Sequence, residues 1–208
     1  MQPARRSNEE RREQSVQHVL AAALQLFVSQ GYENATIDAI AAKAGLTKGA
    51  VYFYFKGKVA LLHALLDDAE ALYAGIFEQM RTSHEGPVEQ LSMFVDWCAE
   101  TGAKNQELLV LPILVSLQAM GMGKEPAVAE HVRKMYDRYH EEMDRIATEG
   151  QALGLFDDKV AIKERAAVLV ALTDGMLLEW YRFADTLDGR ALAESAKAQI
   201  LHGLGVAS

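Results

Sequence analysis

The chain has 208 residues and 50% of them are hydrophobic, which is enough to bury a sizeable core. No apolar run approaches the roughly 20 residues of a membrane span, and the single cysteine, Cys98, excludes an intrachain disulfide. The charged N-terminus also lacks the apolar segment of a secretory signal. We therefore expect a cytoplasmic protein with no membrane partner.

Charge is divided unevenly along the chain, although the total is −8. Residues 1–58 hold eight lysines and arginines against five acidic residues, a net charge of +3, and the remainder carries −11. A basic head on an acidic body can bind a polyanion with the head and hold the body away from it.

Hydrophobic spacing predicts helices throughout, and no segment alternates like a strand, so the expected fold class is all-α. The first helix is expected to begin near Asn8 as its cap and to end at Gly31. Its apolar stripe recurs every three or four residues, at Val16, Leu20, Ala23 and Phe27. The arginines at its start form either an arm that reaches DNA or a solvated helix end: Arg5, Arg6, Arg11 and Arg12.

Two short helices follow, with the spacing of a helix–turn–helix. Thr36 is expected to cap the first, which turns its inner face, Ile37, Ile40 and Ala41, to the core. Gly45 can adopt the positive φ of a sharp turn, after which Leu46 enters the core. Thr47 is expected to cap the second helix, in which Val51 and Phe55 face inward.

The second helix of such a motif enters the DNA major groove, where its first residues meet base edges. Here those residues are Thr47, Lys48, Gly49 and Ala50. The tyrosines that follow, Tyr52 and Tyr54, are expected to donate to phosphates, and Lys58 to meet a phosphate at the start of the next helix. We expect Phe53 and Phe55 to anchor the motif in the core. The alternative is that all four rings are ordinary core residues.

The remainder is predicted to form a larger helical body, joined to the head by a long helix. The expected ranges are Lys58–Arg81, Pro87–Lys104, Glu107–Met120, Pro126–Leu153, Val160–Asp185 and Gly189–Leu204. We place the domain boundary between residues 58 and 59, which gives a head of residues 1–58 and a body of residues 59–208.

One stretch of the head, "TIDAIAAKAGLTKGAVYFYFKGKVALL" preceded by "AAALQLFVSQGY", resembles the DNA-binding domain of the TetR family of bacterial transcriptional regulators. The resemblance covers roughly residues 14–62. It rests on Phe27, Gly31, Thr36, Ile40, Ala41, Ala44, Gly45, Gly49, Tyr52, Phe55 and Lys58. Thr47 replaces the family's usual Ser, a change that keeps the helix cap.

The resemblance implies an all-helical homodimer that binds a palindromic operator in double-stranded DNA, and a C-terminal domain that binds a small effector and then releases the DNA. Our first hypothesis is therefore a repressor that responds to a ligand. The candidate DNA-binding residues are Thr36, Thr47, Lys48, Gly49, Ala50, Tyr52, Tyr54 and Lys58.

The resemblance assigns dimerisation to the last two helices, and their composition agrees. One helix carries an apolar surface wider than a single core face, formed by Ala166, Val170, Leu172, Thr173, Met176, Leu177 and Trp180. The other carries a stripe with small residues, formed by Leu192, Ser195, Ala196, Gln199, Ile200 and Gly203. An internal helix pair is the alternative.

Methionines and aromatic residues in the middle helices suggest a pocket for an apolar or aromatic effector. The candidates are Met93, Trp97, Met120, Tyr136, Tyr139, Met143, Met176 and Trp180. Each could instead be a plain core residue. His131 and His140 lie nine positions apart, which fits no metal-ligand spacing, so neither a metal nor another cofactor is expected.

Three other functions compete with a repressor. An activator of the same fold would have the same DNA-binding head, and a partner adaptor that does not bind DNA would leave the basic head unexplained. An all-helical enzyme is the remaining alternative, but the sequence offers no nucleophile–base pair, metal-ligand set or glycine-rich phosphate loop.

Overall fold

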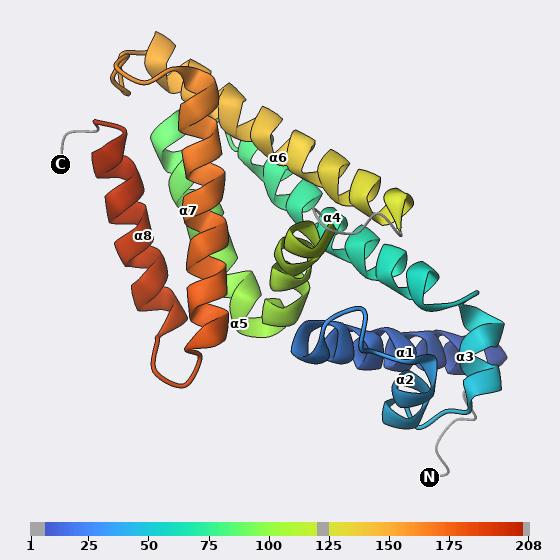
Figure 1. Ribbon diagram of the computed structural model, residues 1–208. Coiled ribbons are helices and arrows are strands. Elements are labelled where there is room, and N and C mark those ends of the chain that lie inside the picture. Colours follow the sequence, from blue (N-terminus) through green and yellow to red (C-terminus); the bar gives the residue numbers. More distant parts are fainter. Residues whose placement is uncertain (1–6, 120–124, 206–208) are drawn as a thin grey trace. The chain divides into compact units, whose positions relative to one another are not determined.

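The computed structural model of the chain describes residues 7–119 and 125–205. Within these ranges the chain forms eight helices and no strand, which confirms the all-α prediction (Figure 1). The helices are α1 (Asn8–Gln30), α2 (Ile37–Lys43), α3 (Lys48–Tyr54), α4 (Lys58–Thr82), α5 (Pro87–Ala119), α6 (Pro126–Ala152), α7 (Ile162–Arg182) and α8 (Gly189–Gly203). In the described part of the chain, no helix is both long enough and apolar enough for a membrane span.

The chain divides into two compact units, residues 1–68 and 69–208. The division lies inside α4 and therefore later than the expected boundary at Lys58. The first unit includes the beginning of α4, where Leu61, Leu62 and Leu65 are buried. The sequence hides this division because the amphipathic pattern of α4 runs through it without a break.

A capping box begins α1 in the first unit. The Ser7 hydroxyl accepts a hydrogen bond from the Glu10 N–H at 3.1 Å, and the Ser7 N–H donates to the Glu10 carboxylate at 2.7 Å. The cap is therefore Ser7 and not the predicted Asn8, which is the first helical residue. Gly31 ends the helix with φ of 80°, as predicted.

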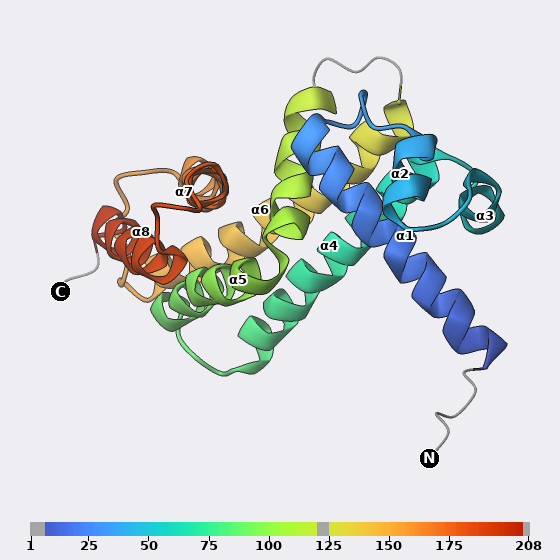
Figure 2. The same ribbon diagram turned by 90° about the horizontal axis from the view of Figure 1, so that it is seen from below.

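Helices α5 to α8 and the later part of α4 form the second unit. Figures 1 and 2 show α7 and α8 side by side, with α5 against them. Asn105 leaves the helical region with φ of −137° and ψ of 39°, which divides α5 as the two predicted ranges require. Trp180 joins three helices, because a Cβ on Gly102 or on Gly189 would lie 2.4 or 2.1 Å from its ring.

A buried carboxylate holds three helices of the second unit together. Glu142 on α6 is 1% exposed and accepts hydrogen bonds from Arg81 on α4 at 2.6 Å and from Arg145 on α6 at 2.6 Å. Arg145 also donates to the side-chain oxygen of Gln90 on α5 at 2.5 Å. Since a buried charge is costly unless it is paired, this network requires both arginines to stay in place.

Replacing Glu142 by Gln should lower the free energy of unfolding by about 2–3 kcal/mol, because Arg81 then loses its counter-charge and Arg145 keeps only the exposed Glu149. Urea unfolding followed by circular dichroism measures this change. Glu149→Gln is the matched control, since Glu149 pairs with the same Arg145 but is 43% exposed. The control should change the free energy by less than about 0.5 kcal/mol. Equal effects of the two variants would contradict the assigned role of Glu142.

Candidate DNA-binding helix and effector cavity

Two threonines cap the two short helices of the head. The Thr36 hydroxyl accepts a hydrogen bond from the Ala39 N–H, and the Thr47 hydroxyl accepts one from the Ala50 N–H, each at 3.2 Å. Gly45 lies between the helices with φ of 69°, a conformation that glycine adopts without strain. The local features of the predicted helix–turn–helix are therefore present.

One face of α3 is exposed to solvent. Lys48, Gly49, Tyr52 and Phe53 are exposed, whereas Val51 is fully buried. The prediction that Phe53 anchors the core is wrong, because its side chain is 77% exposed. Phe53 lies two residues beyond Val51, and at about 100° per residue this places it on the opposite side of the helix.

The other residues around α3 are only partly buried. Tyr54 is half-buried, and its ring meets the Phe53 ring edge-on with the centroids 5.1 Å apart. Phe55 and Leu46, both predicted to enter the core, are also half-buried. Phe55 is the residue at which α3 ends, in an extended conformation.

Lys48 is held by an ion pair with the preceding helix. Its ammonium lies 2.8 Å from the Asp38 carboxylate on α2, and this hydrogen bond raises the pKa of Lys48 above its usual value. Both side chains are exposed, so the pair is weak. Lys48 can therefore exchange Asp38 for another acceptor at low cost.

Lys58 makes contacts inside the head that the sequence does not predict. Its ammonium donates to the backbone carbonyls of Tyr32 at 2.6 Å and of Glu33 at 3.1 Å, and lies 4.3 Å from the centroid of the Tyr32 ring. Lys58 therefore joins the turn after α1 to the start of α4. The predicted phosphate contact would have to use the same ammonium.

The structure describes two of the four arginines near the N-terminus. Arg5 and Arg6 lie outside the described residues, whereas Arg11 and Arg12 are exposed on α1.

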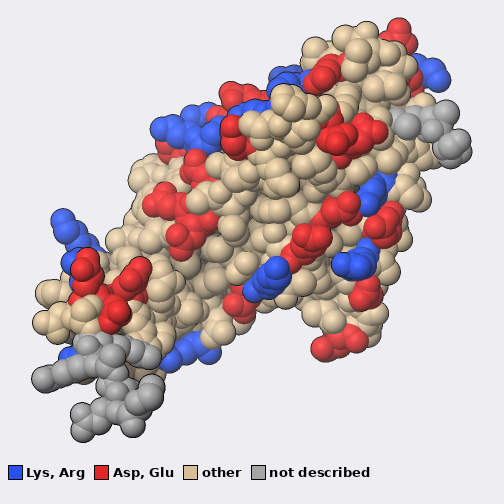
Figure 3. All heavy atoms as spheres, turned by 180° about the vertical axis from the view of Figure 1, so that it is seen from behind, with Lys and Arg blue, Asp and Glu red and all other residues tan. Residues whose placement is uncertain are grey.

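On the face drawn in Figure 3, acidic side chains lie along much of the surface with lysines and arginines between them.

The second unit contains a cavity of about 540 Å³ between four of its helices. This volume is in the range of small-molecule sites. Its lining residues come from α4 (Glu70, Tyr73, Ala74, Phe77, Glu78 and Arg81), α5 (Pro112 and Ile113), α6 (Met135, Tyr136, Arg138, Tyr139 and Glu141) and α7 (Asp174).

Four aromatic rings from α4 and α6 contact one another along the cavity. The centroid of the Tyr139 ring lies 5.6 Å from that of Tyr73, 5.8 Å from that of Phe77 and 6.4 Å from that of Tyr136. The Tyr139 hydroxyl is 2.5 Å from the hydroxyl of Thr173, which fixes the orientation of the ring. Rings at these distances offer stable faces to a flat ligand.

Asp174 places a carboxylate in the cavity wall. The Tyr136 hydroxyl donates to it at 2.7 Å. Burial raises the pKa of Asp174 from 3.8 to about 6, although the hydrogen bond from Tyr136 opposes the shift. The pKa of Tyr136 is also raised, first by burial and then by the Asp174 charge. A lone acid in the apolar run "VALTDGMLL" is the signal by which the sequence could have revealed this group.

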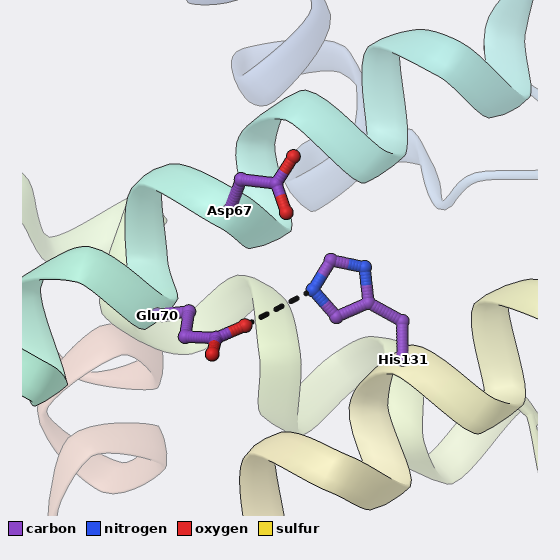
Figure 4. A group of neighbouring side chains, drawn as sticks. All are labelled: Asp67, Glu70 and His131. Carbon is purple, nitrogen blue, oxygen red and sulfur yellow. Dashed lines mark ion pairs between the residues drawn. The ribbon is translucent and has the colours of Figure 1, made fainter.

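The carboxylate of Glu70, at the edge of the cavity, pairs with two side chains of α6. One partner is Arg138, and the other is His131, whose Nε2 lies 3.4 Å from the Glu70 carboxylate (Figure 4). The charge of Arg138 is therefore compensated by Glu70.

The predicted effector-binding residues divide into three groups. Tyr136 and Tyr139 line the cavity, and Met120 lies outside the described residues. The other five lie elsewhere: Met143 and Met176 are buried in the core, Met93 and Trp97 are half-buried, and Trp180 packs on two glycines. Methionine and aromatic content alone does not separate a cavity wall from a core.

The predicted dimerisation surface of α7 also divides in two. Five of its seven residues are buried within the second unit itself: Ala166, Val170, Thr173, Met176 and Leu177. An outer face remains exposed, with Val168 at 55% and Leu172 at 43%, next to Ala171. On α8, Ser195 and Gln199 are exposed, whereas Ile200 is buried. The apolar stripe is wide because it includes both an internal and an external face.

Two family descriptions match successive parts of the chain. Residues 19–65 match "Bacterial regulatory proteins, tetR family", and residues 87–205 match "BetI-type transcriptional repressor, C-terminal". The second match covers more than half of the chain.

Individual relatives agree with these matches. The crystal structure of the MbdR regulator from Azoarcus sp. CIB is 35% identical with a TM-score of 0.83, and the alignment covers 91% of this chain and 98% of that one. The transcriptional repressor BepR of Brucella suis is 24% identical over 78% of each chain. The transcriptional regulator SrpR of Pseudomonas putida is 52% identical over 54 residues, which is 26% of this chain and only 25% of SrpR.

Asp174→Asn should raise the free energy of unfolding at pH 7 by about 1–3 kcal/mol, since folding raises the pKa of this acid and so disfavours its charged form. The asparagine oxygen can still accept from Tyr136. Native Asp174 binds its proton more tightly than the unfolded chain does. The difference between variant and wild type should therefore grow from about pH 4 to about pH 6 and then stay constant.

Urea unfolding across this pH range measures the difference. Asp137→Asn is the control, because Asp137 lies on the exposed side of α6 in an ion pair with Arg133. It should change the free energy of unfolding by less than about 0.5 kcal/mol at every pH. A difference for Asp174→Asn that does not vary with pH would show that its charge carries no such cost.

Proposed function

Because this chain belongs to the tetR family of bacterial regulatory proteins, we propose that it binds a palindromic operator in double-stranded DNA as a homodimer. It represses transcription there until a small effector binds in the cavity and causes the protein to dissociate from the DNA. The exposed face of α3, on a capped helix–turn–helix, is the observation that carries the DNA-binding half of this proposal.

The residues of α3 take different roles on DNA. Lys48, beside Gly49 and Ala50, is proposed to read a base edge, since the glycine leaves room for close approach. The hydroxyls of Tyr52 and Tyr54 are proposed to contact phosphates. The positioning residues are Thr36 and Thr47, which hold the two helices by their caps, and Lys58, which holds the turn before α2.

Phe53 is added to this set because of its exposure. A ring that is 77% exposed on the reading face can contact the methyl group of a thymine. Such an apolar contact would contribute to sequence preference without a hydrogen bond.

Dimerisation is proposed to use the outer faces of α7 and α8. Val168 and Leu172 are large apolar side chains that stay exposed on α7, and the small Ala171 lies between them. A second copy would bury them, and two reading heads would then face two half-sites.

The effector is proposed to be a small apolar or aromatic compound that binds in the cavity of the second unit. Tyr73 and Phe77 of α4 line this cavity, and the beginning of the same helix belongs to the first unit, which contains α3. Effector binding that displaces α4 would change the placement of the heads on DNA. The Bacillus subtilis regulator FadR, 18% identical with a TM-score of 0.72, was crystallised in complex with stearoyl-CoA, but this likeness is one of fold alone.

An activator remains the second candidate, because the sign of regulation depends on where the operator lies. The family is one of transcriptional regulators, so we propose no catalytic activity. A regulator that works on the bacterial chromosome is proposed to act in the cytoplasm.

Selection from random duplex DNA should yield a pseudo-palindrome whose half-sites lie about 34–36 Å apart, or a small multiple of that distance. The reason is that each chain offers one short reading helix. Footprinting on the selected sequence, with sedimentation of the complex, measures site and stoichiometry. A monomer bound to a single asymmetric site would contradict the proposal, and failure to select any sequence would contradict DNA binding itself.

Lys48→Ala and Lys58→Met should act in different ways. Lys48→Ala should reduce the preference for operator over random DNA by about tenfold and leave the free energy of unfolding unchanged. Lys58→Met should weaken binding to both DNAs alike. It should also lower the free energy of unfolding by about 1–2 kcal/mol, because the carbonyls of Tyr32 and Glu33 lose the ammonium as hydrogen-bond donor. Fluorescence anisotropy and urea unfolding measure these effects. An equal loss on both DNAs for Lys48→Ala would make Lys48 a phosphate contact.

A further inference from the structure

The charged residues that line the cavity are unequal in number. Four are acidic and two are basic. The acidic residues are Glu70, Glu78, Glu141 and Asp174, and the basic residues are Arg81 and Arg138. The lining therefore carries a net negative charge. The charge of Arg81 is also paired with Glu142, which does not line the cavity, so the lining is more negative than this count suggests.

Neither arginine has a charge to spare for a ligand. Arg81 is held by the buried carboxylate of Glu142 through two hydrogen bonds of 2.9 and 2.6 Å. Arg138 is paired with Glu70, which lines the same cavity. A ligand anion at either arginine would compete with the carboxylate already bound to it. Drawing Arg81 away would leave the buried Glu142 carboxylate with Arg145 alone.

Three carboxylates of the lining remain uncompensated. Among the described residues, no ion pair joins Glu78, Glu141 or Asp174 to a cation. Glu78 and Glu141 are exposed at the cavity rim, where water screens them. Asp174 is more enclosed, and the hydrogen bond that its carboxylate accepts within the described residues comes from the neutral Tyr136 hydroxyl. The negative potential is therefore strongest at Asp174.

The aromatic rings favour the same kind of ligand as the charges do. Tyr136 donates to Asp174, and the Tyr139 ring stacks beside the Tyr136 ring with the centroids 6.4 Å apart. The face of an aromatic ring attracts a cation, and a flat apolar group packs on it equally well.

We infer that the cavity takes a protonated amine carried on a flat apolar group, with the N–H of the ammonium donating to Asp174 and the flat group lying against the rings of Tyr73, Phe77 and Tyr139. This rests on the proposed effector-binding function of the same cavity. A neutral alcohol can donate to Asp174 but gains nothing from its charge. A carboxylate or phosphate of similar size meets three carboxylates that have no counter-charge.

Three probes with one ring system and three charges test this inference directly. They are naphthylmethylamine, naphthylmethanol and naphthoate, titrated into the full-length protein at about pH 7 by isothermal calorimetry, where the amine is protonated. The amine should bind at least tenfold more tightly than the alcohol, and the alcohol more tightly than naphthoate. Equal affinities of amine and alcohol would overturn the inference, as would tighter binding of naphthoate or no binding of any probe.

Variants locate the effect within the cavity. Asp174→Asn should reduce the preference for amine over alcohol to below threefold and leave the affinity for the alcohol within twofold. Glu141→Gln should reduce it only partly, since Glu141 is exposed. Asp137→Asn, outside the cavity, should leave the tenfold preference intact. A full preference in Asp174→Asn would contradict the assignment of the ammonium to this carboxylate.

The same probes separate this inference from the proposed function. If the amine binds as expected but leaves operator DNA bound, the site is correct and its role as an effector site is not. If another compound releases the operator while the amine does not bind, the proposed function stands and the inference fails.

Discussion

The buried carboxylate of Glu142 is the interaction on which the larger unit depends most. An ionised group that is 1% exposed must be paired, and its partners come from two helices, Arg81 on α4 and Arg145 on α6, with Gln90 on α5 extending the network. The pairing fixes the end of α4 against α6. It also occupies Arg81 at the cavity edge, and the cavity keeps its negative charge as a consequence. One electrostatic requirement thus sets both the packing of the helices and the chemistry of the space between them.

Helix α4 is proposed to transmit a change at the cavity to the DNA-binding helix α3. The helix is continuous from Lys58 to Thr82 and contributes to both compact units. Its first residue holds the turn after α1 through two carbonyls, and its later residues line the cavity. Coupling energies between effector and operator sites are typically about 1–3 kcal/mol. In the proposed switch, a ligand that shifts the balance of contacts around Tyr73 and Phe77 by this amount would weaken operator binding about 5–150-fold.

The sequence predicts the local features well and the tertiary ones poorly. Helix ranges, the caps at Thr36 and Thr47 and the turn at Gly45 follow from short-range spacing, and the structure has them. The prediction for Phe53 was wrong because Phe53 lies two residues from both Val51 and Phe55, and two residues turn a helix by about 200°. Five predicted effector residues lie away from the cavity, since core and cavity wall share one composition. The hydrogen bonds of Lys58 to backbone carbonyls and the ion pairs of Glu142 join residues far apart in the chain. No local sequence pattern predicts such contacts.

In the proposed mechanism, α4 couples the cavity to the DNA-binding helix α3. The most direct measurement is the affinity of naphthylmethylamine for the protein alone and for the protein saturated with its selected operator. By linkage, each ligand must weaken the other by the same factor. We expect the operator to weaken amine binding by about 5–150-fold and the amine to weaken operator binding equally. Identical amine affinities in the two titrations would contradict the coupling, even if the protein binds both partners.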